Sequence, residues 1–281
     1  MNLTDTKSEK TITEKIESLI YRWDLIKTLG EKEILLWETE ALLTIFPHRF
    51  ENIEIILKDM IQLLTKNDRF WSPASSDPNY WDCFNKKEFN SFMDYFTRNL
   101  SENKVNEILS NVNNFQMAIP NECYIESIGD LTNTNKILSL KKPADDIVGS
   151  LKKFGFNLDG YSYINQKLLL TFYHRIHSPV KGKIEKIIPV PKEEGIFGEN
   201  ALWIVDINTT DFGHVYFMLV GESEIQDFTF LVKENQEIEV FDEIGNFNWG
   251  SQTVIFFDAA KFNKNIEIKE GSHFFVGEKI F

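Results

Sequence analysis

Two histidines stand three residues apart in the stretch FYHRIHSPVKG, residues 172–182. His174 and His177 place two groups that titrate near neutral pH in one small region, beside Arg175 and just before Pro179. On a regular strand the two imidazoles would face opposite sides, whereas at an irregular strand end they could converge. The pair is therefore either a half-buried strand with incidental histidines or a candidate acid–base site.

Gly250 and Ser251 lie just before the apolar run 254–257, which predicts a short buried strand. A Gly-Ser pair in such a place most often forms a hairpin turn. Glu122 follows a proline in a strand-like segment and, by itself, is typical of a turn. Together, Glu122, His177 and Ser251 have the residue types of a carboxylate–imidazole–hydroxyl relay, which is recognised by geometry rather than by sequence order.

The composition excludes several functional classes. The chain has 281 residues, a net charge of −13 and no apolar run long enough to span a bilayer. The negative charge argues against a nucleic-acid partner and against purely electrostatic docking on anionic lipid. Cys83 and Cys123 make neither a disulfide framework nor a metal site, and no third ligand lies near the histidine pair, so no metal is expected. The polar N-terminus lacks a signal-peptide core, which favours a cytoplasmic protein with reduced cysteines.

The chain divides into two consecutive regions with different sequence patterns. Residues 1–110 read as a helical N-terminal region, and residues 111–281 read as a β-rich domain with short strands separated by Gly, Pro, Asn and Asp. An aromatic-rich loop is expected to pack down against the protein rather than extend into solvent. The expected helices are 12–30, 31–45, 53–64 and one or two within 86–109, and the loop is 69–84.

The β-rich part contains a weak internal repeat. The stretch KENQEIEVFDEI (233–244) aligns without gaps on KEGSHFFVGEKI (269–280). Such a strand–turn–strand unit resembles the half-motif of the barrel-sandwich fold of lipoyl and biotinyl carriers. Those carriers present a modified lysine at a hairpin tip, whereas Gly250 and Ser251 stand between the two copies here. The expected fold is therefore α+β, with a barrel-sandwich-like repeat in the β-rich domain.

Four stretches in order resemble the phosphatidylserine decarboxylase family, whose usual stretches look like SFNDFFTRxL, SPVDGxVxxxG, DYHRxHxPVxG and ExGxFxxGSTVxxxF. In this chain they read FNSFMDYFTRNL, AIPNECYIESIG, YHRIHSPVKG and EIGNFNWGSQTVIFF. The resemblance covers residues 86–281, and the tail KEGSHFFVGEKIF also looks like the family's usual ending.

The resemblance implies a proenzyme that cleaves itself between Gly250 and Ser251, after which Ser251 becomes a pyruvoyl group, the covalent cofactor. Glycine lets the backbone bend so that the serine hydroxyl can attack the Gly250 carbonyl. At the matching positions, His177 would take the hydroxyl proton and Glu122 would hold the imidazole tautomer. His174 would protonate the carbon left after carbon dioxide departs.

Three departures from the family's stretches concern these residues. Glu122 replaces an aspartate and is one methylene longer, Phe172 replaces the aspartate before Tyr-His-Arg, and Gln252 replaces the threonine after the nucleophile. The carboxylate is retained, so the cleavage machinery is expected to survive. The changes bear mainly on which substrate is used.

The leading interpretation is a decarboxylase that converts phosphatidylserine to phosphatidylethanolamine, with a peripheral membrane contact through the N-terminal helices. The alternatives are a soluble decarboxylase of a free amino acid, with aromatic amino acids among the candidates, and a processing-dead homologue that acts as a binding module. Partners are then a phospholipid or a small amino acid, without nucleic acid, and the family resemblance allows a homodimer.

Overall fold

A computed structural model describes most of the chain beyond residue 78. The chain forms two compact units, one made of Met1–Phe70 with Phe89–Tyr95 and the other of Trp71–Glu88 with Phe96–Phe281. The helices predicted before residue 79 lie outside the described residues, and the predicted division after residue 110 stays a prediction. The described residues are 79–85, 92–131, 151–156, 158–169, 172–190, 202–221, 228–248, 250–262 and 268–281.

The helical pattern in 86–109 resolves into two helices, α5 (Phe92–Phe96) and α6 (Glu102–Val112). The side chain of Ser101 caps α6 by accepting a hydrogen bond from the Lys104 amide at 3.3 Å. α6 buries Ile108 and Val112. Among the described residues, no helix is long and apolar enough to cross a bilayer.

The described end of the aromatic-rich loop packs down as predicted. It contains the 3₁₀ helix η2 (Tyr80–Cys83), and both Tyr80 and Phe84 are buried. Their rings meet edge to face with centroids 5.1 Å apart. They belong to one apolar cluster with Ile108 and Val112 of α6, so the loop is fixed to the β-rich part of the same unit. Residues 69–78 of this loop lie outside the described residues.

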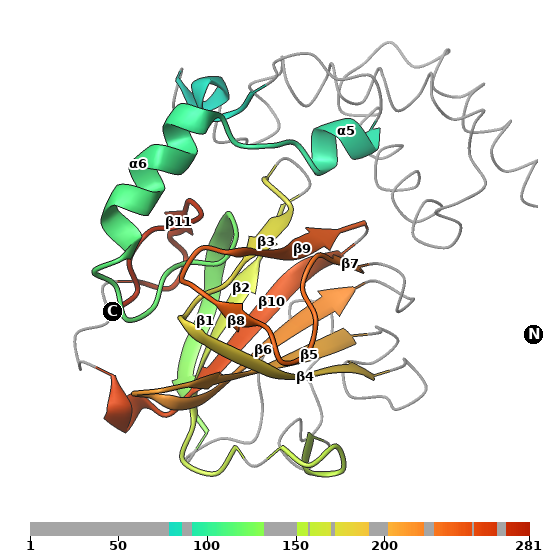
Figure 1. The fold of residues 1–281 in the computed structure, drawn as a ribbon, viewed down its shortest axis with the longest axis vertical. Helices are drawn as coiled ribbons and strands as arrows, with labels where there is room; N and C mark the ends of the chain where they lie inside the picture. Colours follow the sequence, from blue (N-terminus) through green and yellow to red (C-terminus); the bar gives the residue numbers. More distant parts are fainter. Residues whose placement is uncertain are drawn as a thin grey trace, which may run out of the picture. The chain divides into compact units, whose positions relative to one another are not determined.

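The predicted β-rich region is confirmed, and all its strand pairs are antiparallel (Figure 1). An eight-stranded sheet has the order β11-β1-β2-β10-β6-β5-β4-β8, and a three-stranded sheet has the order β3-β9-β7. The strands are β1 (Cys123–Asp130), β2 (Ser162–Lys167), β3 (Arg175–His177), β4 (Gly182–Val190), β5 (Leu202–Thr209), β6 (Gly213–Gly221), β7 (Phe228–Phe230), β8 (Glu237–Ile238), β9 (Glu243–Phe247), β10 (Gly250–Phe257) and β11 (His273–Phe274).

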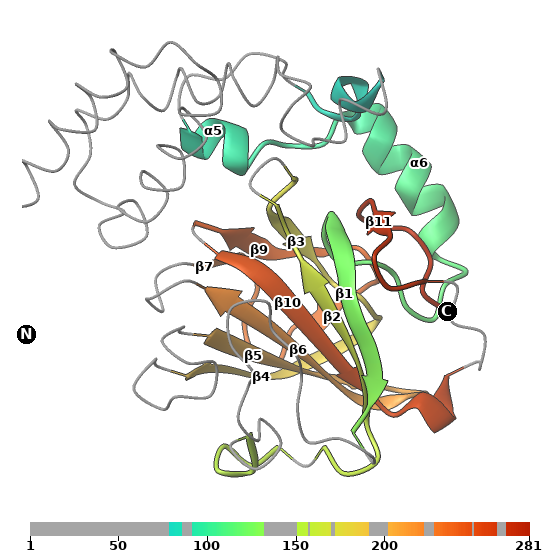
Figure 2. The same ribbon diagram turned by 180° about the vertical axis from the view of Figure 1, so that it is seen from behind.

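The short buried strand predicted at 254–257 is the second half of β10. β10 pairs with β2 on one side and β6 on the other (Figure 2). Val254, Ile255 and Phe256 are buried. The preceding strand, β9, pairs with β3 and β7 in the other sheet, so Gly250 and Ser251 do not form the tip of a hairpin.

The internal repeat is also real in the fold, because both copies make the same hydrogen bonds. In the first copy the amide of Phe241 donates to Ser178 at 2.9 Å, and in the second the amide of Gly277 donates to Ile119 at 2.8 Å. In each copy two residues adopt the left-handed backbone, at matching positions. They are Asn235 (φ 66°) and Phe241 (φ 74°) in the first copy, and Gly271 (φ 74°) and Gly277 (φ 82°) in the second.

The segments that receive the two copies repeat in the same way and cross each other. The amide of His177 donates to the carbonyl of Pro120 at 2.8 Å, and the amide of Ala118 donates to the carbonyl of Pro179 at 2.9 Å. Residues 118–120 and 177–179 thus exchange equivalent hydrogen bonds, as two parts related by a local twofold axis do. This crossing brings the segment that carries Glu122 beside the segment that carries the histidine pair.

Candidate active site

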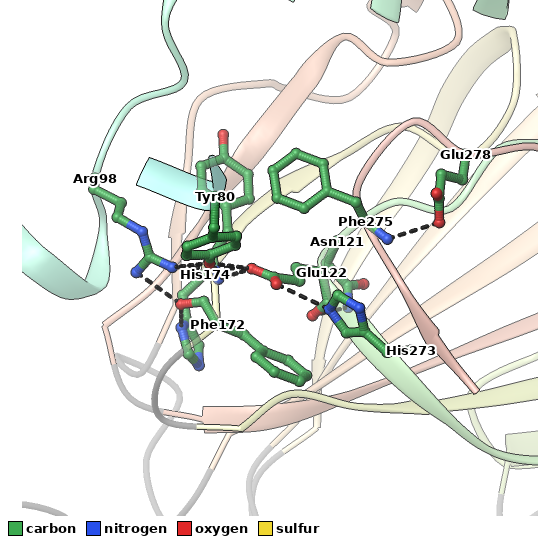
Figure 3. Close-up of polar contacts among 10 residues, drawn as sticks. Tyr80, Arg98, Asn121, Glu122, Phe172, His174, His273, Phe275 and Glu278 are labelled. Carbon is green, nitrogen blue, oxygen red and sulfur yellow. Dashed lines mark hydrogen bonds and ion pairs between the residues drawn. The ribbon is translucent and has the colours of Figure 1, made fainter. Parts of the chain in front are cut away.

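The carboxylate of Glu122 is fully buried just before β1 and is bonded on both oxygens (Figure 3). Oε2 accepts hydrogen bonds from the Tyr80 hydroxyl at 2.7 Å and from the backbone amide of Tyr173 at 2.8 Å. Oε1 lies 2.9 Å from Nε2 of His273 on β11. A buried carboxylate needs such partners, because an unpaired charge in the interior is costly.

A buried arginine ties Glu122 to the histidine segment. The Arg98 guanidinium donates to the Tyr80 hydroxyl at 2.6 Å and to the carbonyl of Phe172 at 2.9 Å, and it lies 3.9 Å from Oε2 of Glu122. The central guanidinium carbon of Arg98 also lies over the Phe84 ring, 4.4 Å from its centroid. Arg98 therefore balances the charge of Glu122 and orients the backbone next to His174.

His174 is held as a neutral base. Its Nδ1 lies 2.8 Å from the carbonyl of Phe172, and because a carbonyl only accepts, Nδ1 carries the proton and Nε2 keeps a lone pair. The ring is fully buried and stacks on Phe96 with centroids 3.5 Å apart. Burial, with a smaller contribution from the Arg98 charge, holds the pKa of His174 well below its ordinary value. Nε2 has no hydrogen-bond partner within the described part of the chain.

His177 at the end of β3 is also neutral, but both of its ring nitrogens are bonded. Nδ1 lies 2.8 Å from the carbonyl of Phe241, and Nε2 lies 2.9 Å from the hydroxyl of Tyr173. The Phe241 ring stacks on the imidazole with centroids 4.2 Å apart. Burial lowers the pKa of His177 to about 4, the Phe241 carbonyl partly offsets this, and the charge of Arg175 adds to the lowering.

The predicted hydrogen bond between Glu122 and His177 does not form. Glu122 binds His273 instead, and the Nδ1 proton of His177 goes to a backbone carbonyl. Tyr173 connects the two residues, since its amide donates to Glu122 and its hydroxyl meets His177. Two of the three predicted relay members therefore share one cluster without direct contact.

Gly250 and Ser251 open β10 at an irregularity in the sheet. Gly250 pairs with Gly221 of β6, and the register shifts before Gln252, so Ser251 is the extra residue of a β-bulge. Bulges interrupt the ladder and redirect side chains, and they are frequent next to active sites. The side chain of Ser251 lies outside what the structure describes. The amide of Phe247, which ends β9, donates to the carbonyl of His174 at 3.1 Å, so the segment that leads into Gly250 is bonded to the histidine segment.

Comparison with known proteins gives this arrangement a family. A family model described as phosphatidylserine decarboxylase matches residues 92–281. The chain belongs to the phosphatidylserine decarboxylase family. The phosphatidylserine decarboxylase proenzyme of Bacillus mycoides is 25% identical over 206 residues, which are 69% of this chain and 77% of the relative. The proenzyme of Chlamydia felis is 27% identical over 186 residues, 60% of each chain.

Other relatives share a shorter and more similar stretch. Phosphatidylserine decarboxylase proenzyme 2 of Komagataella phaffii is 34% identical over 95 residues, which are 30% of this chain. That stretch spans 9% of the Komagataella protein, so the chain matches only a small part of that relative's length.

The three departures from the family's usual stretches have visible structural consequences. The longer side chain of Glu122 is the one that meets His273. At position 172 the backbone carries the polar contact, because its carbonyl receives both Arg98 and His174, while the Phe172 ring packs 5.1 Å from the His273 ring.

The third departure, Gln252, joins a polar cluster between β10, β2 and the segment just before β1. The amide of Gln252 donates to Asn165 on β2 at 2.7 Å. One residue further, the Thr253 hydroxyl lies 2.7 Å from Gln166 and 3.0 Å from Asn121. The hydroxyl that the family's usual threonine would supply is thus present one position later on β10, and it faces the segment that carries Glu122.

Sequence reasoning missed four members of the site. Arg98 and Tyr173 lie inside the stretches that carry the family resemblance, so their presence there was the available signal. Tyr80 stood out only as one of several aromatic residues in a loop. His273 lies inside the second copy of the repeat, and no motif in the sequence marks it as part of a site.

Proposed function

We propose that this chain is a self-cleaving proenzyme that becomes a pyruvoyl-dependent decarboxylase converting phosphatidylserine to phosphatidylethanolamine and carbon dioxide. The observation that carries the proposal is the bond between the Phe247 amide and the His174 carbonyl, at 3.1 Å, in a chain of this family. It ties the segment that carries the two buried neutral imidazoles to the segment that enters Gly250 and Ser251.

In the first step, the Ser251 hydroxyl attacks the Gly250 carbonyl carbon and the peptide bond becomes an ester. The proton that leaves the hydroxyl must reach a base, and we assign His177 to this role from its family position. Its Nε2 lone pair is bonded to the Tyr173 hydroxyl at 2.9 Å, so the proton reaches it through that hydroxyl or after the hydroxyl moves aside. Elimination across the ester then frees the Gly250 carboxylate, and hydrolysis releases ammonia and leaves the pyruvoyl group at residue 251.

The residues around β10 fit such a group. The pyruvoyl carbonyl supplies an electron sink for the pair released with carbon dioxide. His174 offers a buried Nε2 without a partner among the described residues, which is what a proton carrier facing a substrate needs. Because His174 is neutral, Nε2 must first take a proton, and the ammonium of the substrate's serine head group can supply it. The same proton then goes to the carbon that carbon dioxide has left.

Intact mass tests the first half of the proposal. We expect a fragment that ends at Gly250 and a fragment of residues 251–281 without a free N-terminal amine. Ser251→Ala should remain one chain, and Ser110→Ala, which removes an exposed hydroxyl on α6, should cleave like the parent. A parent chain that stays whole after long incubation at neutral pH contradicts the proposal.

Release of carbon dioxide tests the substrate. Cleaved protein is incubated with phosphatidylserine vesicles and, separately, with free amino acids including aromatic ones. Release from vesicles alone supports the proposal. Release from a free amino acid alone would replace phosphatidylserine by that substrate while leaving the decarboxylase chemistry in place.

The proposal includes further features that were expected from the sequence. The protein is placed in the cytoplasm with a peripheral membrane contact, as a homodimer, and its repeat is taken as a barrel-sandwich-like unit of the lipoyl and biotinyl type. The shared hydrogen bonds of the two copies support the last of these. Liposome co-sedimentation with and without residues 12–64, and the mass of the assembly in solution, test the others.

A further inference from the structure

We propose that Phe241 is a positioning residue for His177, whose carbonyl fixes the imidazole tautomer and whose ring fixes the imidazole plane. The proposal rests on the proposed function only for the role of His177 in self-cleavage. The geometry stands by itself, because both parts of one residue engage the same imidazole. The carbonyl lies 2.8 Å from Nδ1, and the two rings stack at 4.2 Å with planes only 5° apart.

The backbone at Phe241 is unusual for an aromatic residue. Its φ is 74°, in the left-handed region, where a Cβ crowds the backbone and bulky residues are outliers. The second copy of the repeat shows what the turn itself requires, because the matching residue is Gly277 with φ 82°. The two turns make equivalent hydrogen bonds, so the turn needs a left-handed residue but not a phenyl ring.

The difference between the copies points to what the phenyl ring does. The first copy bonds to the segment that carries His177. The second copy bonds to the segment that carries Ala118 at the position equivalent to His177. The strained aromatic residue therefore occurs in the copy that has an imidazole to hold. Both residues are only 5% exposed, so the stack is buried.

The left-handed backbone also explains why the carbonyl meets Nδ1. The Phe241 amide is fixed by the Ser178 carbonyl at 2.9 Å, and the Ser178 amide is fixed by the Asp242 carbonyl at 2.7 Å. The peptide that contains the Phe241 carbonyl is itself held, because the Asp242 amide donates to the Glu239 carbonyl at 3.1 Å. The left-handed φ, together with ψ, at residue 241 therefore sets the direction in which the carbonyl points. A residue that leaves the left-handed region would turn that carbonyl away from His177.

Two substitutions separate the backbone from the ring. Phe241→Gly removes the ring but accepts the left-handed backbone, as Gly277 does. Phe241→Val also removes the ring, and its branched Cβ opposes the left-handed backbone. Asn235→Val is the matched control, because Asn235 has φ 66° in the same repeat, is exposed, and makes its backbone bond to Ile184 rather than to the His177 region.

The measurement is the tautomer of His177, read from its ring-nitrogen NMR shifts in uncleavable Ser251→Ala protein. The parent, Phe241→Gly and Asn235→Val should show a single tautomer with the proton on Nδ1, and Phe241→Gly should show faster ring motion. Phe241→Val should show a mixture of both tautomers. The proposal is overturned if Phe241→Val keeps the single tautomer, if Asn235→Val disturbs it equally, or if the Phe241→Gly ring moves no faster than in the parent.

Cleavage rates of the same variants with Ser251 present give a second readout. Phe241→Gly should cleave more slowly than the parent, and Phe241→Val more slowly still, with Asn235→Val near the parent rate. Should Phe241→Val fail to fold, the Phe241→Gly ring motion and cleavage rate still decide the role of the ring. If no variant or parent cleaves while the tautomers behave as expected, the proposed function fails and the positioning role stands.

Discussion

Nε2 of His273 lies 2.9 Å from Oε1 of Glu122, and this pair closes one side of a buried polar cluster that Arg98 closes on the other. His273 is the partly exposed member, with a quarter of its side chain accessible, whereas Glu122 is fully buried. The pair therefore connects the interior of the site to solvent through the His273 imidazole.

Glu122→Gln tests how much the site needs the charge. The amide oxygen can still accept from Tyr80 and Tyr173, and its NH₂ group can donate to His273 once that ring changes tautomer. We expect slowed rather than abolished cleavage and a loss of about 1–3 kcal/mol in unfolding free energy. In a double-mutant cycle with His273→Ala, the two changes should couple by about 0.5–3 kcal/mol. Strict additivity would show that the 2.9 Å contact has no energetic weight.

The two imidazoles should separate by stage. His177→Ala should slow cleavage by about 10²–10⁴-fold, because the Ser251 hydroxyl then lacks its base. His174→Ala should still cleave but turn over slowly, because its role comes at protonation of the carbon. The fraction cleaved over time is measured first, followed by carbon dioxide release from the cleaved portion. If His174→Ala blocks cleavage while His177→Ala does not, the two roles are exchanged.

Stability should fall as the pH drops through the range set by His177. Its pKa falls from 6.5 to about 4 on folding, so the unfolded chain binds the proton more tightly. The contribution of His177 to stability is complete above pH 6.5 and is lost progressively as the pH falls to about 4, by roughly 3 kcal/mol. In urea unfolding of the Ser251→Ala chain, His177→Gln should flatten this decline. An unchanged slope would show that the imidazole does not stay neutral on folding.

Arg98→Lys tests the connection between the two parts of the site. A lysine keeps the charge beside Glu122 but cannot bond the Tyr80 hydroxyl and the Phe172 carbonyl together in one planar fork. We expect a loss of about 1–3 kcal/mol in the free energy of unfolding. We also expect carbon dioxide release to fall by more than the fraction of cleaved protein falls, because the Phe172 carbonyl also holds His174. Lys104→Arg on the surface of α6 is the control. Unaltered kinetics in Arg98→Lys would remove Arg98 from the positioning of His174.

The stretches that carried the family resemblance predicted which segments meet. The histidine segment, the segment of Glu122 and the start of β10 come together through the strand pairing and the crossing at Pro120 and Pro179. The helices in 86–109 and the buried strand at 254–257 followed from periodicity, because burial of one face leaves a regular pattern in the sequence.

Side-chain partners did not follow, because direction is set by the backbone at single residues. The left-handed turn at Phe241 aims a carbonyl at His177 and so removes the need for a carboxylate there. The partner of His273 could not be read from its neighbours in the sequence, because Glu122 lies 151 residues away along the chain. The order of strands in the sheet likewise depends on crossings that alternating apolar patterns leave open.

The place of β10 between β2 and β6 has a consequence for the reversibility of unfolding. A cut before Ser251 would leave a separate chain of residues 251–281 whose first strand is held on both sides by ladders of the larger chain. The two pieces would stay together while folded, yet unfolding would release them as different molecules. Refolding would then require their encounter, so it would depend on concentration, and dilution alone would make the loss of structure permanent.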